Sequence, residues 1–319
     1  MSEFNRLIEF IRSEVNKSLN DLNLPNKPTY LYQPIRYAID AKGKRFRPIL
    51  VHLSGRSTNV DPDALMNISL AIELLHIFTL VHDDIMDNDT LRHGKITIHE
   101  KWDSSTAILA GDGIYTLAQI VLNDLPENIN KISKYFNKTT LEICEGQALD
   151  KEFEHDKNVT EDMYLDMIEK KTGALLGASA VLPAIYNGEK GKLIDSYEQF
   201  GRCLGKGFQI HDDILEVTAD SQTMGKSLGS DITEGKQTLM VIKARNEYPD
   251  KWNDIISSSD NQEQFNNICK FFKKTGILEE SRSIANSYFN YSIDSLNNLE
   301  GVNTDELVQL VELIKKRKY

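Results

Sequence analysis

The chain carries two groups of carboxylates that could bind a metal ion. Each group follows a run of apolar residues and contains the local sequence His-Asp-Asp-Ile, first at 81–85 as VHDDI and again at 210–214 as IHDDI. The two groups consist of Asp83, Asp84 and Asp87, and of Asp212, Asp213 and Glu216. On a helix, residues four apart share a face and the next residue lies beside them, so each group would form one acidic patch.

Carboxylates at this density suit a hard cation. Three of them held close together repel one another and raise each other's pKa values unless a cation lies between them. Mg²⁺ prefers oxygen ligands, keeps several waters and commonly completes its shell with phosphate oxygens of a substrate. One acidic triple on a helix is usually only a solvated face, but two copies, each after buried-looking sequence, indicate a magnesium site for a phosphate-bearing substrate.

A phosphate-bearing substrate also requires cations from the protein. Basic residues near glycine or turn residues occur in five places, which contain Lys44, Arg45 and Arg47; Arg92; Lys170 and Lys171; Lys226; and Lys236. Each place by itself resembles ordinary surface charge. Together, in a chain with a net charge of −11, they indicate local binding of a small anion and argue against nucleic acid as a partner.

The length and composition predict one large soluble domain, residues 1–319, because no low-complexity stretch or Pro/Gly/Ser linker divides the chain. Cys144, Cys203 and Cys269 lie far apart in apolar surroundings, which favours reduced thiols and a cytoplasmic location. No secretory signal is visible. The longest weakly polar run, 174–186, contains Pro183 and is shorter than the roughly 20 residues of a membrane helix, so we expect no stable membrane insertion.

Apolar residues recur at three and four positions almost everywhere, and strict alternation is absent, so the sequence predicts an all-α fold. Helices are predicted at 3–20, 32–42, 45–56, 61–91, 104–124, 129–153, 160–187, 190–220, 232–247, 261–273, 276–298 and 303–316. Several central segments are apolar on more than one face, which is typical of helices buried inside a large bundle.

Taken in order, these motifs resemble those of the trans-type isoprenyl diphosphate synthases, or polyprenyl synthetases. The matching segments are GKRFRP at 43–48, LVHDDIMDNDTLRHG at 80–94, CEGQALD at 144–150, KKTGAL at 170–175, GKGFQIHDDILEVTAD at 205–220 and GKSLGSDITEGKQTL at 225–239. Six motifs in the right order and spacing, spread over nearly the whole chain, are a highly specific match.

The resemblance implies a single helical bundle around a deep central cavity, the isoprenoid synthase type I fold, with the two acidic motifs facing each other across its mouth. It implies three Mg²⁺ ions that bridge carboxylates to the diphosphate of an allylic substrate. The implied metal ligands are Asp83, Asp87 and Asp212, with Asp84, Asp213 and Glu216 supporting metals or waters.

The resemblance also assigns the residues that hold the two substrates. Arg92, Lys171 and Lys226 would bind the allylic diphosphate, and Lys236 belongs to the same substrate-binding loop. Lys44, Arg47 and His76 would bind isopentenyl diphosphate without metal, with Phe208 beside it. Thr172 and Gln209 would place dipoles near the reacting carbons. Basic residues at the C-terminus, Lys316 or Arg317, would cover the isopentenyl diphosphate site.

The implied reaction condenses isopentenyl diphosphate with an allylic diphosphate, head to tail and in trans geometry. Ionisation of the allylic C–O bond leaves a diphosphate anion whose charge Mg²⁺, Lys and Arg stabilise, inside a dry cavity that protects the carbocation. The residue five positions before the first acidic motif, Phe78, would form the floor of the product pocket, with the smaller Thr79 beside it. This pattern favours a C20 product, geranylgeranyl diphosphate, followed by C15 farnesyl diphosphate.

Two positions depart from the family pattern. His93 stands where the family has a second arginine assigned to isopentenyl diphosphate, and a neutral imidazole lacks the bidentate fork of a guanidinium. Glu216 stands where the family usually has aspartate, but a longer carboxylate can still reach a metal-bound water.

Several alternatives remain open at this point. A longer-chain polyprenyl synthase would use the same chemistry with a deeper pocket, and a class I terpene cyclase would share the first acidic motif but has no second diphosphate for Lys44 and Arg47. A non-catalytic partner subunit is favoured only by His93. The Glu-x-x-His pairs Glu73/His76 and Glu152/His155 fit a di-iron bundle. The family is usually dimeric, and the apolar segment 104–124 could form the face of a homodimer.

Overall fold

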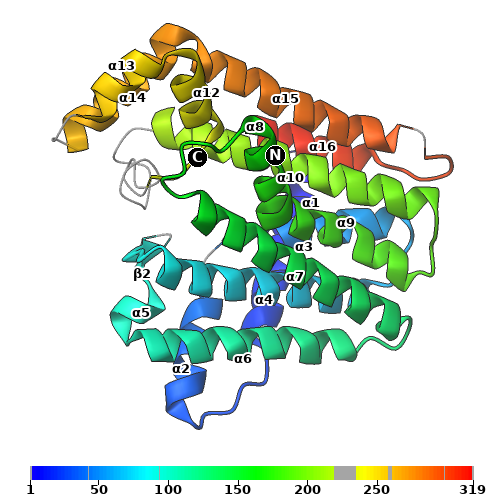
Figure 1. Ribbon diagram of the computed structural model, residues 1–319. Helices are drawn as coiled ribbons and strands as arrows, with labels where there is room; N and C mark the ends of the chain where they lie inside the picture. Colours follow the sequence, from blue (N-terminus) through cyan, green and yellow to red (C-terminus); the bar gives the residue numbers. More distant parts are fainter. Residues whose placement is uncertain are drawn as a thin grey trace.

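The computed structural model describes residues 2–41, 43–92, 94–218, 235–257, 261–297 and 299–317, and this part of the chain is almost entirely helical (Figure 1). The helices are α1 (Glu3–Asn20), α2 (Thr29–Ile39), α3 (Phe46–Ser57), α4 (Pro62–Met86), α5 (Ile98–Lys101), α6 (Ser104–Asn123), α7 (Ile129–Phe153), α8 (Glu161–Ile168), α9 (Ala174–Tyr186), α10 (Lys192–Thr218), α12 (Leu239–Glu247), α13 (Pro249–Ile256), α14 (Asn261–Thr275), α15 (Ile277–Leu296) and α16 (Asp305–Lys315). The predicted all-α class is confirmed.

The structure corrects some predicted boundaries. Helix α4 ends at Met86 rather than at 91, because Asn88 adopts a left-handed conformation and the chain then forms a two-stranded hairpin, β1 (Leu91–Arg92) and β2 (Lys95–Ile96). Helix α12 begins at Leu239 rather than at 232, with the Thr238 side chain capping it. The short helices α5 and α13 were not predicted. Residues 219–234, which include part of the predicted helix at 232–247, lie outside the described residues.

The predicted helix at 160–187 contains a change of winding. It runs as α8, then a π-helical turn η1 (Glu169–Gly173), then α9. A π-turn inserts one extra residue, turns the following side chains to a new direction and occurs frequently at functional sites. Lys171 and Thr172, two of the predicted site residues, lie in this turn.

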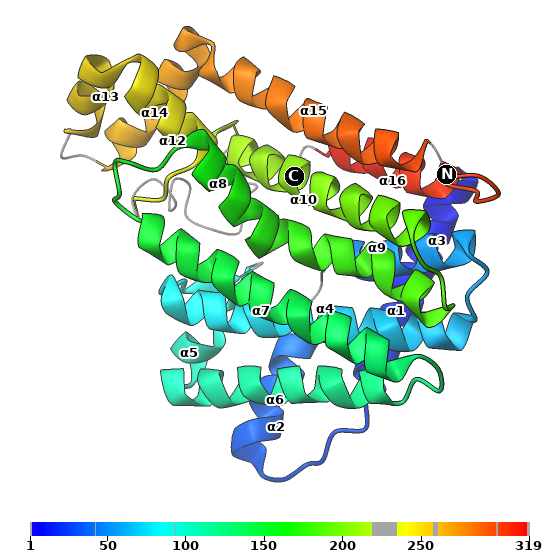
Figure 2. The same cartoon turned by 45° about the vertical axis from the view of Figure 1, so that its right-hand side comes forward.

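Helix α4 is the interior helix of the bundle. It packs against α6 on one side and against α3 and α9 on another, while α10 packs between α9 and α15, so the helices form successive layers (Figure 2). The N-terminus of α4 is capped by Asp61, which accepts a hydrogen bond from the backbone N–H of Ala64 at 3.1 Å, and Pro62 occupies the first turn.

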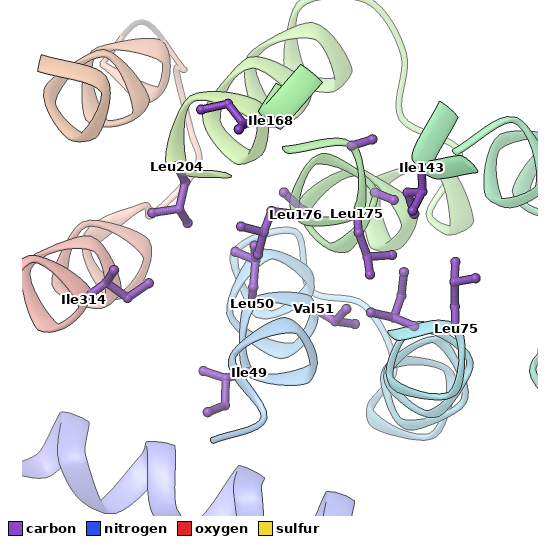
Figure 3. Packing of buried hydrophobic residues seen from close by; sticks show 14 of the residues in the cluster. Ile49, Leu50, Val51, Leu75, Ile143, Ile168, Leu175, Leu176, Leu204 and Ile314 are labelled. Atoms are coloured by element: carbon purple, nitrogen blue, oxygen red, sulfur yellow. The ribbon is translucent and has the colours of Figure 1, made fainter. Parts of the chain in front are cut away.

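The apolar core joins helices that are distant in sequence. Figure 3 shows side chains from α3, α4, α7, the α8–α9 segment, α10 and α16 converging on one cluster. Helices α4 and α6 are long and apolar enough to cross a membrane by length and composition alone. Burial accounts for α4, since 67% of its most apolar window lies inside the protein, as expected for a core helix.

A buried ion pair fixes the start of α3 against α4. Arg45 adopts a left-handed backbone conformation (φ 53°), and its guanidinium donates to Glu73 Oε1 at 2.5 Å, to Asn16 Oδ1 at 2.9 Å and to the carbonyl of Ala41 at 2.8 Å. Side chains of both Arg45 and Glu73 are about 5% exposed or less. These three acceptors hold a backbone geometry that a non-glycine residue adopts only under constraint.

The chain offers a matched test of this pair. Glu73→Gln leaves the Arg45 guanidinium buried without its anion, so we expect the free energy of unfolding to fall by about 3–5 kcal/mol. Arg12 and Glu9 form an ion pair of the same length, 2.5 Å, but it is exposed, so Glu9→Gln should cost only about 0–1 kcal/mol. Urea unfolding of both variants measures the difference, and equal losses would contradict the role assigned to burial.

Candidate active site

The first acidic group lies at the C-terminal end of α4, with Asp83 and Asp84 in its last turn and Asp87 as the residue that ends it. Cations from other segments contact these carboxylates. Arg92 donates from Nε to Asp84 Oδ1 at 2.6 Å, and the Asp87 carboxylate lies 3.5 Å from Lys151 Nζ and 3.4 Å from Lys236 Nζ. Arg92 and Lys236 were both predicted to bind substrate, and both lie at the first acidic group.

Burial dominates the electrostatics of this group. It raises the pKa of Asp83 above its ordinary value, and the neighbouring Asp87 raises that pKa further, while Lys171 and Arg92 oppose the shift. Positive charge beside Asp83 therefore favours its carboxylate form.

The second acidic group lies on α10 and is held by hydrogen bonds. The buried Asp213 accepts from the Tyr164 hydroxyl at 2.6 Å and from Gln209 Nε2 at 2.9 Å. Asp212 forms an ion pair with Arg317 near the C-terminus. Burial raises the pKa of Asp212 to about 6, against the attraction of Arg317 and of Lys44. Glu216 lies one turn further along the same helix and is half-buried.

The π-turn η1 links the two acidic groups. Lys171 Nζ lies 2.5 Å from Asp150 Oδ2 and close enough to Asp83 to affect its pKa. Thr172 donates from Oγ1 to Gln209 Oε1 at 2.9 Å, and that glutamine in turn donates to Asp213. The chain of contacts therefore runs from the end of α4, through η1, to the middle of α10.

A glycine of α7 makes this arrangement possible. A methyl group at Gly146 would lie 2.3 Å from the backbone nitrogen of Lys171. The absence of a side chain lets α7 lie directly against the π-turn, so that Asp150, one turn further along α7, reaches the Lys171 ammonium.

The predicted metal-free basic group assembles around Arg47. Arg47 donates from Nη1 to His76 Nε2 at 3.0 Å, and its buried Nε has no hydrogen-bond partner among the described residues. Burial lowers the pKa of Arg47, and burial together with Arg317 lowers the pKa of Lys44. Two cations whose charge is disfavoured by burial form a site that gains stability when an anion binds.

An aromatic ring and a small apolar pocket adjoin this basic group. The Arg317 guanidinium lies 4.7 Å from the centre of the Phe208 ring, within cation–π distance. The pocket lies between α3, α9, α10 and α16, with Arg47 and Phe208 in its wall. Phe208 therefore lies beside Arg47, and the basic C-terminal residue Arg317 lies over Phe208, as the sequence analysis expected.

Phe78, the residue predicted to limit the product length, is half-buried and faces α6. Its ring centre lies 4.7 Å from that of His82 and 5.3 Å from that of Tyr115. Thr79 donates its hydroxyl to the carbonyl of His76 at 2.8 Å. His93 and Lys226 lie outside the described residues, so their predicted roles stay predictions.

The structure adds residues that the sequence analysis did not assign, namely Gln147, Asp150, Lys151 and Tyr164. Gln147 is 7% exposed, and neither end of its side-chain amide finds a hydrogen-bond partner among the described residues. The motif CEGQALD contained the signal for Gln147 and Asp150, since two polar residues three apart on an otherwise packed helix point in similar directions. Tyr164 and Lys151 carried no comparable signal.

The donor set fits a hard divalent cation. Both acidic groups offer only oxygen, and Asp87 Oδ1 is buried without a hydrogen bond from any described residue. The carboxylates are spread over α4 and α10, and within the described ranges no three His, Cys, Asp or Glu side chains are gathered closely enough to form a metal site by themselves. A metal ion here needs further oxygen ligands, which water or a phosphate-bearing substrate can supply.

Comparisons with known proteins show which family the chain belongs to. The Polyprenyl synthetase family model matches residues 28–272. The chain is 42% identical over 235 residues to the geranylgeranyl diphosphate synthase of Methanosarcina mazei, covering 73% of this chain and 72% of that one. It is 37% identical to the geranylgeranyl pyrophosphate synthase of Geoglobus acetivorans, with 96% of each chain covered.

A solved structure shows the same fold. The polyprenyl synthase from Caulobacter crescentus CB15, complexed with calcium and isoprenyl diphosphate, matches with a TM-score of 0.88 and 25% identity over 99% of this chain and 97% of that one. The chain belongs to the polyprenyl synthetase family. The resemblance drawn from its motifs is confirmed, and the di-iron alternative is wrong, since Glu73 is bound by Arg45 and His76 by Arg47.

Proposed function

We propose that this protein is a Mg²⁺-dependent prenyltransferase that condenses isopentenyl diphosphate with an allylic diphosphate to give geranylgeranyl diphosphate, C20. The observation that carries the proposal is the presence of two separate anion sites. One combines the acidic groups with Arg92 and Lys171, and the other consists of Lys44, Arg47 and His76 without a carboxylate in direct contact with Arg47. The names of the two relatives support this activity and this product.

A second diphosphate site would also favour this function over that of a terpene cyclase. A cyclase acts on one prenyl diphosphate, so the buried Arg47 with its unpartnered Nε would have no anion to bind. A non-catalytic partner subunit has no need for either site, yet both are assembled here.

Up to three Mg²⁺ ions would be held by Asp83, Asp87 and Asp212, with Asp84, Asp213 and Glu216 orienting ligands or waters. When bound, Mg²⁺ neutralises the diphosphate and stabilises the charge that develops on it as the allylic C–O bond breaks. The calcium and isoprenyl diphosphate of the Caulobacter crescentus structure support a divalent cation beside a diphosphate in this fold.

The protein's own residues then act on the two substrates. Arg92 and Lys171 bind the allylic diphosphate before and after the C–O bond breaks, with Lys226 as a further predicted ligand. Thr172 and Gln209, which are hydrogen-bonded to each other, direct oxygen dipoles toward the allylic carbocation. Apolar side chains of the core exclude water that would otherwise capture this cation.

The second anion site positions isopentenyl diphosphate for attack. Lys44, Arg47 and His76 hold its diphosphate, so its double bond can form the new C–C bond to the carbocation. The new bond forms at the terminal carbon of that double bond and leaves a tertiary carbocation at the adjacent carbon. Loss of a proton from the CH2 group on the other side of the cationic carbon then forms the new double bond. We assign this proton to the departed diphosphate, because that anion is the base left beside the reacting carbons when the allylic C–O bond breaks. The product is five carbons longer and can react again.

The activity is tested with purified protein, Mg²⁺, isopentenyl diphosphate and one allylic diphosphate per assay: dimethylallyl, geranyl or farnesyl. We expect all three to be extended and C20 to dominate, as measured by mass spectrometry of the products. Arg47→Met should raise the KM for isopentenyl diphosphate by at least about tenfold, since it removes a charged hydrogen-bonding partner. Absence of condensation with every allylic diphosphate would overturn the proposed function.

Product length depends on Phe78 in this proposal. Phe78→Ala removes a ring that packs against His82 and Tyr115, and the space released lies between α4 and α6. We expect products longer than C20 to become dominant, with the rate of the first condensation reduced less than about threefold, because Phe78 provides no charge or hydrogen bond to either anion site. Phe10→Ala, which removes an exposed ring from α1, is the matched control, and its product should stay C20. An unchanged C20 product from Phe78→Ala would show that another residue limits chain length.

We also propose a homodimer that uses α6. Ile108, Leu109 and Ile120 are each about half exposed or more, and at 100° per residue they lie within about 120° of the helix circumference. An apolar face of this kind is characteristic of an interface between subunits. Sedimentation equilibrium should give the mass of two chains, and Leu109→Glu combined with Ile120→Glu should shift it toward one. A monomeric wild-type protein would contradict the dimer.

A further inference from the structure

Lys151 is a cation at the first acidic group that the proposed mechanism does not use. Its side chain extends from α7 to the end of α4 and is about one-third exposed. Its Nζ lies 2.6 Å from Glu154 Oε1, 3.2 Å from the carbonyl oxygen of Met86 and 3.5 Å from Asp87 Oδ1. An ammonium has three N–H groups, so each of these oxygens can engage one of them.

The three contacts are not equivalent. The Glu154 and Met86 contacts are hydrogen bonds of ordinary length, whereas the contact to Asp87 Oδ1 is a longer ion pair. The same Asp87 oxygen is buried and accepts no hydrogen bond from any described residue. A cation therefore lies beside an assigned metal ligand at the outer limit of hydrogen-bond distance, and it is held more closely by a second carboxylate.

We propose that Lys151 competes with Mg²⁺ for Asp87 and is retained by Glu154 when the metal binds, so that it sets the Mg²⁺ concentration that the first acidic group requires. This proposal rests on the proposed function, because it concerns the metal of the same site. The ammonium stabilises Asp87 before the metal arrives and repels a divalent ion that approaches the same oxygen. Glu154 reduces the cost of the exchange, since Lys151 keeps an anionic partner throughout.

An alternative role for Lys151 is to cap α4. Its hydrogen bond to the Met86 carbonyl satisfies one of the acceptors that a helix C-terminus leaves free, and a positive charge there is favourable. Capping and competition predict different results for a neutral side chain that can still donate a hydrogen bond. Lys151→Gln keeps a donor for Met86 but removes the charge near Asp87.

The test measures metal binding directly and in the absence of substrate, with Mn²⁺ as an EPR-visible probe. We expect the Mn²⁺ dissociation constant to fall by about two- to fivefold in Lys151→Gln, the range expected for loss of a partly exposed charge. Lys138→Met is the matched control, because it removes the same charge from an exposed position on α7 that is about 20 Å away along the helix, and its Mn²⁺ affinity should be unchanged.

Glu154→Gln should act in the opposite direction. Without its second partner, the ammonium is held more strongly at Asp87, so Mn²⁺ should bind more weakly than to the wild-type protein. Equal Mn²⁺ affinity in wild type, Lys151→Gln and Glu154→Gln would overturn the proposal. So would weaker Mn²⁺ binding in Lys151→Gln, which would make Lys151 a structural cap. Thermal melting identifies variants that fail to fold, and Lys151→Met then provides a second neutral variant.

The binding measurement also separates this proposal from the proposed function. Opposite shifts of Mn²⁺ affinity in the two variants, without formation of any prenyl product, would support Lys151 as a competitor and reject the prenyltransferase activity. Normal product formation at saturating Mg²⁺, with unchanged metal affinity in every variant, would support the prenyltransferase activity and reject Lys151 as a competitor.

Discussion

The positions of most functional residues follow from one electrostatic constraint at the end of α4. Three carboxylates lie where a long buried helix ends, and the free carbonyl groups there already give that end a partial negative charge. The helix dipole and the mutual repulsion of the carboxylates both destabilise this arrangement. Positive charge therefore has to come from other segments. The positive charge comes from the β-hairpin, α7, η1 and the segment before α12, through Arg92, Lys151, Lys171 and Lys236.

This constraint also explains why the site needs close packing between helices. Helix α7 lies directly against the π-turn at Gly146, and this close packing brings Asp150 to the Lys171 ammonium. On the other side of the same turn, a methyl group at Gly205 of α10 would lie 2.4 Å from the α-carbon of Gly173. The π-turn is therefore held between two helices through glycine contacts, and its extra residue lets Lys171 face Asp150 while Thr172 faces Gln209.

The features of the fold that the sequence predicted correctly are those that depend on local residue patterns. The helical periodicity indicated the all-α class, and the repeated His-Asp-Asp-Ile segments indicated the acidic groups, because both signals lie within one or two turns of helix. The end of α4 was predicted too late, since no glycine or proline marks it and a left-handed Asn88 performs that role.

Roles that depend on contacts between distant segments could not be predicted in the same way. In the sequence, Arg45 could not be distinguished from the other basic residues of the GKRFRP motif. In the fold, its guanidinium is buried and forms an ion pair with Glu73, 28 residues away. Tyr164 and Asp213 are 49 residues apart, and the hydrogen bond between them becomes visible only when α8 and α10 are packed together. Lys151 was missed for the same reason, since only the fold brings it to Asp87.

The two anion sites solve the problem of binding a diphosphate in different ways. At the acidic groups, Asp84 and Asp87 are already paired with cations, so in the proposed function an anionic substrate would bind there together with metal ions. At Arg47 the balance is reversed, because burial disfavours the charge of a guanidinium whose Nε is unpartnered, and an incoming diphosphate relieves that cost directly. Arg317 lies between the two sites, paired with Asp212 and stacked over Phe208. In the proposed function, this difference between the sites would distinguish the two substrates by whether a diphosphate binds with metal or without it.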